Sequence, residues 1–251
     1  MTIYKAINGL GIVLFWAVLL GLVYATPVPL VDAILLALLL AAVPTFSVAQ
    51  VPLIRDIQIE RLPAYWSSII TLWLIGTACW FVGTREGGAA ALGLGAIPLS
   101  KFIGWTVGVT LVSLLIMFAS RQITVMTGGF DSPLLRQLLP RSPEERRLFV
   151  ALSVAAGSGE ELAYRGYAIP LLTPLIGLPG AAVLTTLVFG IMHGYQGWLG
   201  IARTTIMGGV LAYAFIASGS LWPPIAAHIL IDVFAGITLG ERLLVTPKEA
   251  V

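Results

Sequence analysis

Eight long apolar runs, separated by short polar connections, limit what this chain can fold into more than any other feature of its sequence. A run of about 18 apolar residues or more is typical of a helix that crosses a lipid bilayer. Only 10% of the residues are charged and 58% are hydrophobic, whereas soluble domains are about a quarter charged. The sequence therefore predicts an all-α, polytopic membrane bundle of about eight transmembrane helices, at residues 7–25, 29–53, 62–83, 102–119, 146–172, 179–197, 199–217 and 221–239.

We expect a single membrane domain over residues 1–251, because the sequence shows no soluble segment, low-complexity stretch or inverted repeat. Within it, residues 1–120 form four N-terminal helices, 121–147 a cytoplasmic basic connector and 148–240 the helices that carry the polar motifs described below. The first run leads directly into a second one, so we interpret it as a retained helix and not as a cleaved signal. The one cysteine, Cys79, excludes an intrachain disulfide and is expected to be a small buried apolar residue.

The distribution of lysine and arginine predicts the orientation. Ten of these residues fall on one side of the predicted bundle and only Arg85 and Lys101 on the other, which by the positive-inside rule places both termini in the cytoplasm. We expect a multi-pass integral protein of a bacterial inner (plasma) membrane. Its surroundings are the lipid bilayer, and we do not expect it to bind nucleic acid. The ten are Lys5, Arg55, Arg61, Arg121, Arg136, Arg141, Arg146, Arg147, Arg242 and Lys248.

The basic connector ends in a sequence that is typical of a helix N-terminus. Ser142 suits the N-cap, Pro143 the first helical position, and Glu145 completes a capping box. Helix five is therefore predicted to begin at the cytoplasmic interface. Arg203, a few residues into the seventh run, is expected to extend to the same interface as an anchor, with the binding of a substrate carboxylate as the alternative.

Three charges interrupt the fifth apolar run. Glu160 lies eleven residues beyond Phe149, or ~16 Å at 1.5 Å per residue, which is near the middle of a ~30 Å hydrocarbon core. Glu161 and Arg165 are four residues apart, so they share a helix face and are predicted to form an ion pair. Glu160 has no such intrahelical partner, and a charge at this depth requires a polar cavity or a partner.

The two histidines of the chain also lie inside apolar runs. The same rise places His193 ~21 Å, His228 ~10 Å and Asp232 ~16 Å from the outer face. His228 and Asp232 share a helix face, so Glu160, His193, His228 and Asp232 could converge from three helices. Each residue alone could be structural, but their common depth favours a polar site. Small residues beside them, Gly157, Gly159, Gly190 and Gly194, are expected to let helices five and six approach closely.

Three ordered motifs give these residues a family resemblance. The segment EELAYR from Glu160 fits EExxxR, FGIMH from Phe189 fits FxxxH, and HILID from His228 fits HxxxN/D. Together, over residues 143–240, they resemble the CPBP family of intramembrane proteases, which includes the CAAX prenyl endoprotease and bacteriocin-processing or immunity proteins. In the CAAX endoprotease branch the last position is typically asparagine, whereas this chain has Asp232.

The resemblance implies hydrolysis of a peptide bond in a membrane-anchored peptide or protein, prenylated or bacteriocin-like. It implies that Glu160 is the general base and that His193 positions the attacking water. His228 and Asp232 would lie across the scissile carbonyl, with Asp232 either holding His228 as a donor or itself protonated.

Further roles and alternatives follow from the same residues. Glu161 and Arg165 would support the helix or bind a substrate carboxylate. We favour a site without a cofactor; the rival mechanism uses His193, His228, Asp232 and Glu160 as ligands for zinc. Two other functions stay open at this stage: a proton- or ion-coupled transporter, and a non-catalytic immunity or binding protein of the same fold.

Overall fold

The computed structural model describes residues 2–55 and 57–246, and in these ranges the chain is helical with no strands. Six helices in this part are long and apolar enough to cross a membrane, and a shorter apolar helix covers Trp222–Thr238. The predicted all-α, polytopic membrane bundle is confirmed.

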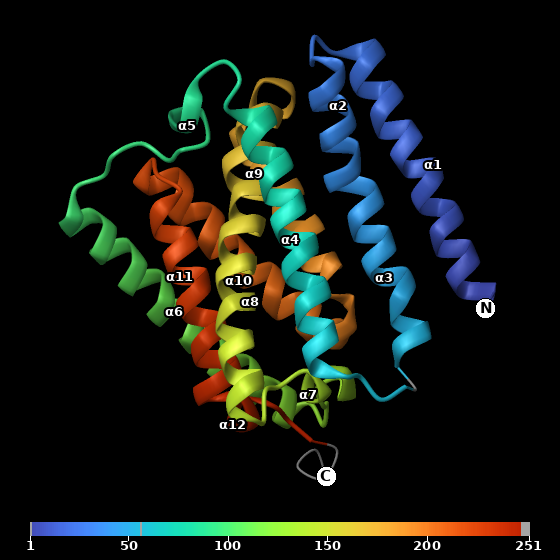
Figure 1. The fold of residues 1–251 in the computed structure, drawn as a ribbon, viewed down its shortest axis with the longest axis vertical. Coiled ribbons are helices and arrows are strands. Elements are labelled where there is room, and N and C mark those ends of the chain that lie inside the picture. Colours follow the sequence, from blue (N-terminus) through green and yellow to red (C-terminus); the bar gives the residue numbers. More distant parts are fainter. Residues whose placement is uncertain (1, 56, 247–251) are drawn as a thin grey trace.

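The N-terminal region forms a side layer of the bundle (Figure 1). Helix α1 covers Thr2–Ala25, and the second span is built from α2 (Leu30–Ala37), the π-helical segment η1 (Leu38–Ala42) and α3 (Val43–Ile54). α1 packs along this second span, and α4 (Arg61–Gly83) packs against α8. Cys79 of α4 is fully buried, as expected.

The fourth span and the connector differ from the prediction. After the short α5 (Gly88–Ala91), α6 runs from Leu99 to Met126, well beyond the expected residues 102–119. Apolarity marks only the part of a helix inside the hydrocarbon, whereas the polar end of α6 continues the same hydrogen-bonded helix. The first residues assigned to the connector thus belong to α6, and the rest contains the short helix α7 (Pro133–Gln137).

The fifth and sixth spans form one 50-residue helical stretch, Pro143–Met192, made of α8 (Pro143–Glu161), the π-helical segment η2 (Leu162–Ala168) and α9 (Ile169–Met192). Gly177 breaks it, with φ 74° and ψ 158°, a conformation that side chains with a Cβ rarely adopt. The six long apolar helices become seven when the two arms of this stretch are counted separately. With the shorter helix Trp222–Thr238 they correspond to the eight predicted segments. The capping box is confirmed: Ser142 Oγ accepts from the Glu145 amide at 3.1 Å and Glu145 accepts from the Ser142 amide at 3.0 Å.

The sixth helix ends earlier than predicted, at Met192 and not at residue 197. His193 is its C-cap, with φ −87° and ψ 23°, and the one-turn 3₁₀ helix η3 (Gly194–Gln196) follows. Gly197, with φ 79°, then opens α10 (Gly197–Ser218). The chain ends with α11 (Trp222–Val233), the π-helical segment η4 (Phe234–Thr238) and α12 (Gly240–Leu243).

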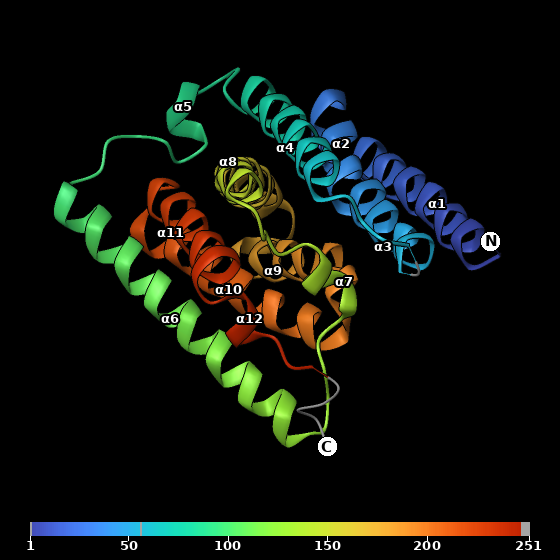
Figure 2. The same ribbon diagram turned by 60° about the horizontal axis from the view of Figure 1, so that its bottom comes forward.

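Helix α8 occupies the centre of the bundle, between α4 on one side and α11 on the other (Figure 2). A Cβ on Gly157 would lie 3.0 Å from the Ile229 amide nitrogen of α11, and one on Gly159 would lie 2.7 Å from the Leu72 carbonyl of α4. The expectation that these glycines bring helices five and six together is therefore wrong. Each of these glycines allows the close approach of a different helix. Gly190 faces Thr205 of α10, and Gly194 faces Val48 of α3.

Candidate active site

The predicted ion pair of the fifth span is present at the junction of α8 and η2. Arg165 Nη1 donates to Glu161 Oε1 at 2.8 Å, and the two side chains are 1% and 0% exposed. Arg165 Nη2 donates to the Gly208 carbonyl of α10 at 2.8 Å, and the guanidinium carbon lies 4.4 Å from the centre of the Phe189 ring. A buried cation needs this set of partners, because each unpaired donor would cost the free energy of its lost hydration.

Glu161 also holds the second histidine. His228 Nδ1 of α11 lies 2.8 Å from Glu161 Oε1, so the ring donates from Nδ1 to the carboxylate oxygen. Glu161, and not Asp232, is therefore the hydrogen-bond partner of His228 Nδ1, and the alternative that Asp232 is itself protonated stays a prediction. The i, i+4 spacing placed Asp232 beside the ring, whereas the packing of α11 on α8 brings Glu161 to its Nδ1 atom.

The other ring nitrogen of His228 faces two carboxylates. Nε2 lies 3.8 Å from Glu160 Oε2 and 3.8 Å from Asp232 Oδ2. The side chains of Glu160 and Asp232 are 15% and 33% exposed, whereas Glu161 is fully buried. Adjacent glutamates thus have different environments: Glu161 is enclosed, and Glu160 borders the accessible side of the cluster.

His193 lies at the end of α9, at a helix terminus and not within the helix. Its Nδ1 is 2.8 Å from the Phe189 carbonyl oxygen, which can only accept, so Nδ1 carries a hydrogen and Nε2 remains available to the site. The Phe189 ring lies 4.9 Å from the His193 ring and 6.1 Å from the His228 ring, centre to centre. Both imidazole rings therefore lie near one phenylalanine ring.

Two π-helical segments adjoin the motif residues. η2 begins directly after Glu161 and contains Arg165, and η4 begins directly after the helix that carries His228 and Asp232. π-helical turns are rare and occur frequently at functional sites. Apart from the charged residues themselves, nothing in the sequence pattern predicted these π-helical segments.

Imidazole nitrogens and carboxylates are donor types that zinc accepts. Yet within residues 2–55 and 57–246 no three His, Cys, Asp or Glu side chains are grouped so that they could hold a metal ion. Both Nδ1 atoms are engaged, by Glu161 and by the Phe189 carbonyl, so only Nε2 of each ring is available to act as a metal ligand.

The expectation for Arg203 is wrong. Its side chain is 9% exposed, and Nη1 donates to Asp131 Oδ1 at 3.2 Å, so Arg203 is a buried partner of the connector and not an exposed anchor. Sequence reasoning missed Asp131, because an isolated acid in a polar connector resembles an ordinary solvated residue. The partnership joins positions 72 residues apart, which helix periodicity cannot relate.

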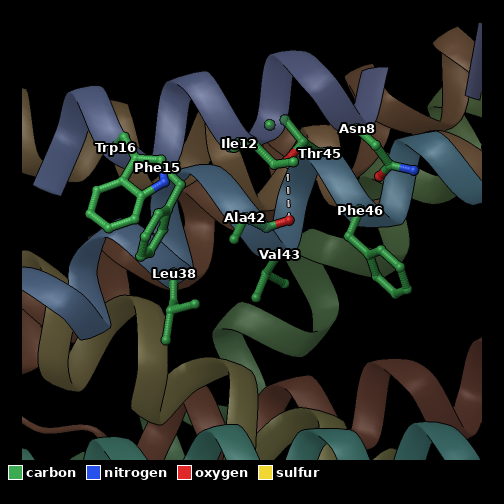
Figure 3. A pocket seen from close by; sticks show the side chains of 10 residues that line it. Asn8, Ile12, Phe15, Trp16, Leu38, Ala42, Val43, Thr45 and Phe46 are labelled. Atoms are coloured by element: carbon green, nitrogen blue, oxygen red, sulfur yellow. Dashed lines mark hydrogen bonds between the residues drawn. The ribbon is translucent and has the colours of Figure 1, made fainter. Parts of the chain in front are cut away.

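An apolar groove of about 480 Å³ lies elsewhere, between α1 and the η1–α3 segment (Figure 3). Ile12, Phe15 and Trp16 line one side and Val43 and Phe46 the other, with Asn8 and Thr45 as polar members. No ionisable side chain lines it, so the groove offers no acid or base.

Comparison with known proteins supports the resemblance noted in the sequence. Residues 143–234 match the family model described as type II CAAX prenyl endopeptidase Rce1-like, which confirms the similarity to the CPBP/CAAX protease family and covers all three motifs. A search of curated proteins and a search of solved structures each found no match. The family model points to a membrane protease, and the apolar helices agree with an integral membrane protein.

Proposed function

We propose that this protein is an intramembrane endopeptidase that hydrolyses a peptide bond in a membrane-anchored peptide or protein. The observation that carries the proposal is the placement of His228 Nε2 3.8 Å from Glu160, on a ring held by the buried Glu161. A carboxylate at the accessible edge and an oriented donor behind it are what addition of water to an amide requires.

The first step uses Glu160 as general base. Glu160 takes a proton from water as the water oxygen attacks the scissile carbonyl carbon, and the carbonyl oxygen becomes the oxyanion of a tetrahedral intermediate. His193 positions the water through Nε2, because its Nδ1 hydrogen is committed to the Phe189 carbonyl. The proton held by Glu160 then passes to the leaving nitrogen as the C–N bond breaks, which yields an acid and an amine.

His228 stabilises the oxyanion. In its doubly protonated form, the ring donates from Nδ1 to Glu161 and from Nε2 to the oxyanion. The surrounding carboxylates of Glu160, Glu161 and Asp232 favour this positively charged form. Asp232, one of these carboxylates, contributes charge beside the ring, and Arg165 balances the charge of Glu161.

Cleavage with isotopic water tests the proposal. The purified protein in liposomes is incubated in H₂¹⁸O with membrane-anchored peptides, some prenylated and some not, and the products are analysed by mass spectrometry. We expect one ¹⁸O in the new carboxyl terminus and a loss of about 10³-fold with Glu160→Gln, since Gln keeps the shape but cannot take a proton. If no peptide is cleaved, the endopeptidase proposal is wrong and a non-catalytic binding protein is favoured. If Glu160→Gln cleaves as fast as the wild type, Glu160 is not the general base.

The proposed mechanism needs no zinc, and Asp232 offers the test. We expect Asp232→Asn to keep turnover within about 10-fold and a strong chelator to leave the wild-type rate unchanged. Elemental analysis of active protein measures the metal directly. Stoichiometric zinc that is lost, together with activity, in Asp232→Asn would replace this mechanism with the metal-dependent one.

A further inference from the structure

The turn that presents His193 is short and is not held by α9 alone. His193 is the C-cap of α9, and the Gln196 amide donates to the His193 carbonyl at 2.9 Å, which closes the turn formed by η3. This backbone bond fixes the curvature of the turn. It does not fix the turn relative to α10 or to the rest of the bundle.

η3 packs against α10, α3 and α7, and the Gln196 side chain adds hydrogen bonds to α10. Its Oε1 accepts from Arg203 Nη2 at 3.3 Å and from Thr204 Oγ1 at 3.4 Å, both on α10. Its Nε2 donates to the Tyr195 hydroxyl at 3.3 Å. The space for this carboxamide exists because residue 200 is a glycine: a Cβ there would collide with the Gln196 side chain.

Arg203 connects Gln196 to two further segments. The guanidinium donates from Nη1 to Asp131 Oδ1, and Asp131 Oδ2 accepts from the Val245 amide at 2.8 Å. The Asp131 amide in turn donates to the Val245 carbonyl at 3.0 Å. Arg203 and Asp131 are 9% and 3% exposed, so this connection lies inside the fold and joins the connector, the C-terminal segment, α10 and the η3 turn.

The network ends at the active site. The Tyr195 ring, whose hydroxyl accepts from Gln196, lies 6.0 Å from the His193 ring, centre to centre. A shift of Gln196 would therefore move the ring beside His193 and the backbone that carries it.

We infer that Arg203 is a positioning residue for His193, acting through Gln196 and Tyr195 and held in place by Asp131. This inference rests on the proposed function for its effect on turnover, but the orientation of His193 can be measured without any substrate. Arg203 suits the role because a guanidinium can donate to Asp131 and to Gln196 at once. A lysine ammonium is a single point charge and cannot span both.

The test uses the fact that the chain has only two histidines. Protein labelled with ¹⁵N-histidine gives the two rings as separate NMR signals, and His193→Gln assigns them. We expect Gln196→Leu and Arg203→Lys to shift the His193 signal and leave the His228 signal in place. In cleavage assays, both variants should lower kcat about 10-fold or more at an unchanged KM, because His193 positions water and does not bind the peptide.

Gln137→Leu is the matched control, since Gln137 also accepts through its carboxamide, from the Ile59 amide at 2.9 Å, and is outside the network. It should leave both histidine signals unchanged. An unmoved His193 signal in Gln196→Leu and Arg203→Lys would overturn the inference. So would a joint shift of both histidines, which indicates a general structural role. A protein that cleaves nothing but shows the selective shift would refute only the proposed function.

Discussion

Two ion pairs attach to opposite ends of η2, and they are built differently. At the start of η2, Glu161 and Arg165 are 0% and 1% exposed. Near its other end, Tyr167 donates to Asp32 Oδ1 at 2.8 Å, and Asp32 Oδ2 accepts from Arg85 Nη2 at 2.6 Å, where Arg85 is 38% exposed. The outer pair keeps its cation in contact with its surroundings, whereas both charges of the inner pair are enclosed.

The difference indicates what each pair is for. The outer pair ties the α4–α5 loop and α2 to η2, a structural task that an exposed arginine can perform at little cost. The inner pair leaves Glu161 Oε2 buried and without a hydrogen-bond partner among the described residues, which is unfavourable for stability alone. Its second contact, to His228, gives this arrangement a purpose under the proposed function, since Glu161 holds the ring of His228 in place.

The largest effect on stability is expected at the inner pair. Arg165→Ala should lower the free energy of unfolding by about 3–5 kcal/mol, because it leaves the Glu161 carboxylate buried without its cation. The double variant Glu161→Ala/Arg165→Ala should be less destabilised than this single variant. Thermal unfolding in detergent measures both, and equal losses in the two would contradict an energetically coupled pair.

The two carboxylates should differ in their effect on turnover. Glu161→Gln should lower kcat on the order of 10²-fold, comparable to the loss of one oxyanion donor, because His228 loses the charge that favours its protonated form. Asp32→Asn changes the outer carboxylate in the same way and should leave kcat within about twofold. Initial rates of peptide cleavage provide the measurement. Similar losses of kcat in the two variants would contradict a specific role of Glu161 in turnover.

A smaller effect is expected for the hydroxyl of the outer pair. Tyr167→Phe removes only the hydrogen bond to Asp32 and should cost about 1 kcal/mol of unfolding free energy, the net value of one hydrogen bond. Denaturant titration of the reconstituted protein would measure it. A loss as large as that of Arg165→Ala would show that the outer pair is as tightly coupled to the fold as the inner one.

The smallest effect is expected for the exposed cation. Arg85→Gln should cost about 0.2–1 kcal/mol, the range of solvent-accessible ion pairs. The difference from the wild-type protein should shrink further at high salt, because ions screen accessible charges. Unfolding curves at low and high ionic strength test this, and a salt-independent difference would mean that Arg85 is more enclosed than its exposure indicates.

The sequence by itself determined the membrane bundle, the start of helix five and the Glu161–Arg165 pair. Each depends on short-range rules: the length of an apolar run, the capping box at Ser142, and the i, i+4 spacing on one helix face. The same rules selected Glu160, His193, His228 and Asp232 as candidates, because ionisable groups in hydrocarbon are costly. Their catalytic roles remain predictions.

Only the tertiary structure decided which of these groups contact one another. The partner of His228 Nδ1 is Glu161 and not the neighbouring Asp232, and Arg203 is buried against Asp131. Both contacts join different segments of the chain, and their geometry depends on how α11 and α10 pack, which periodicity along one helix does not contain. The end of α9 at Met192 also had to come from the structure: the sequence placed the end of the sixth span at residue 197, but the backbone turns after Met192, and His193 is the C-cap of the helix.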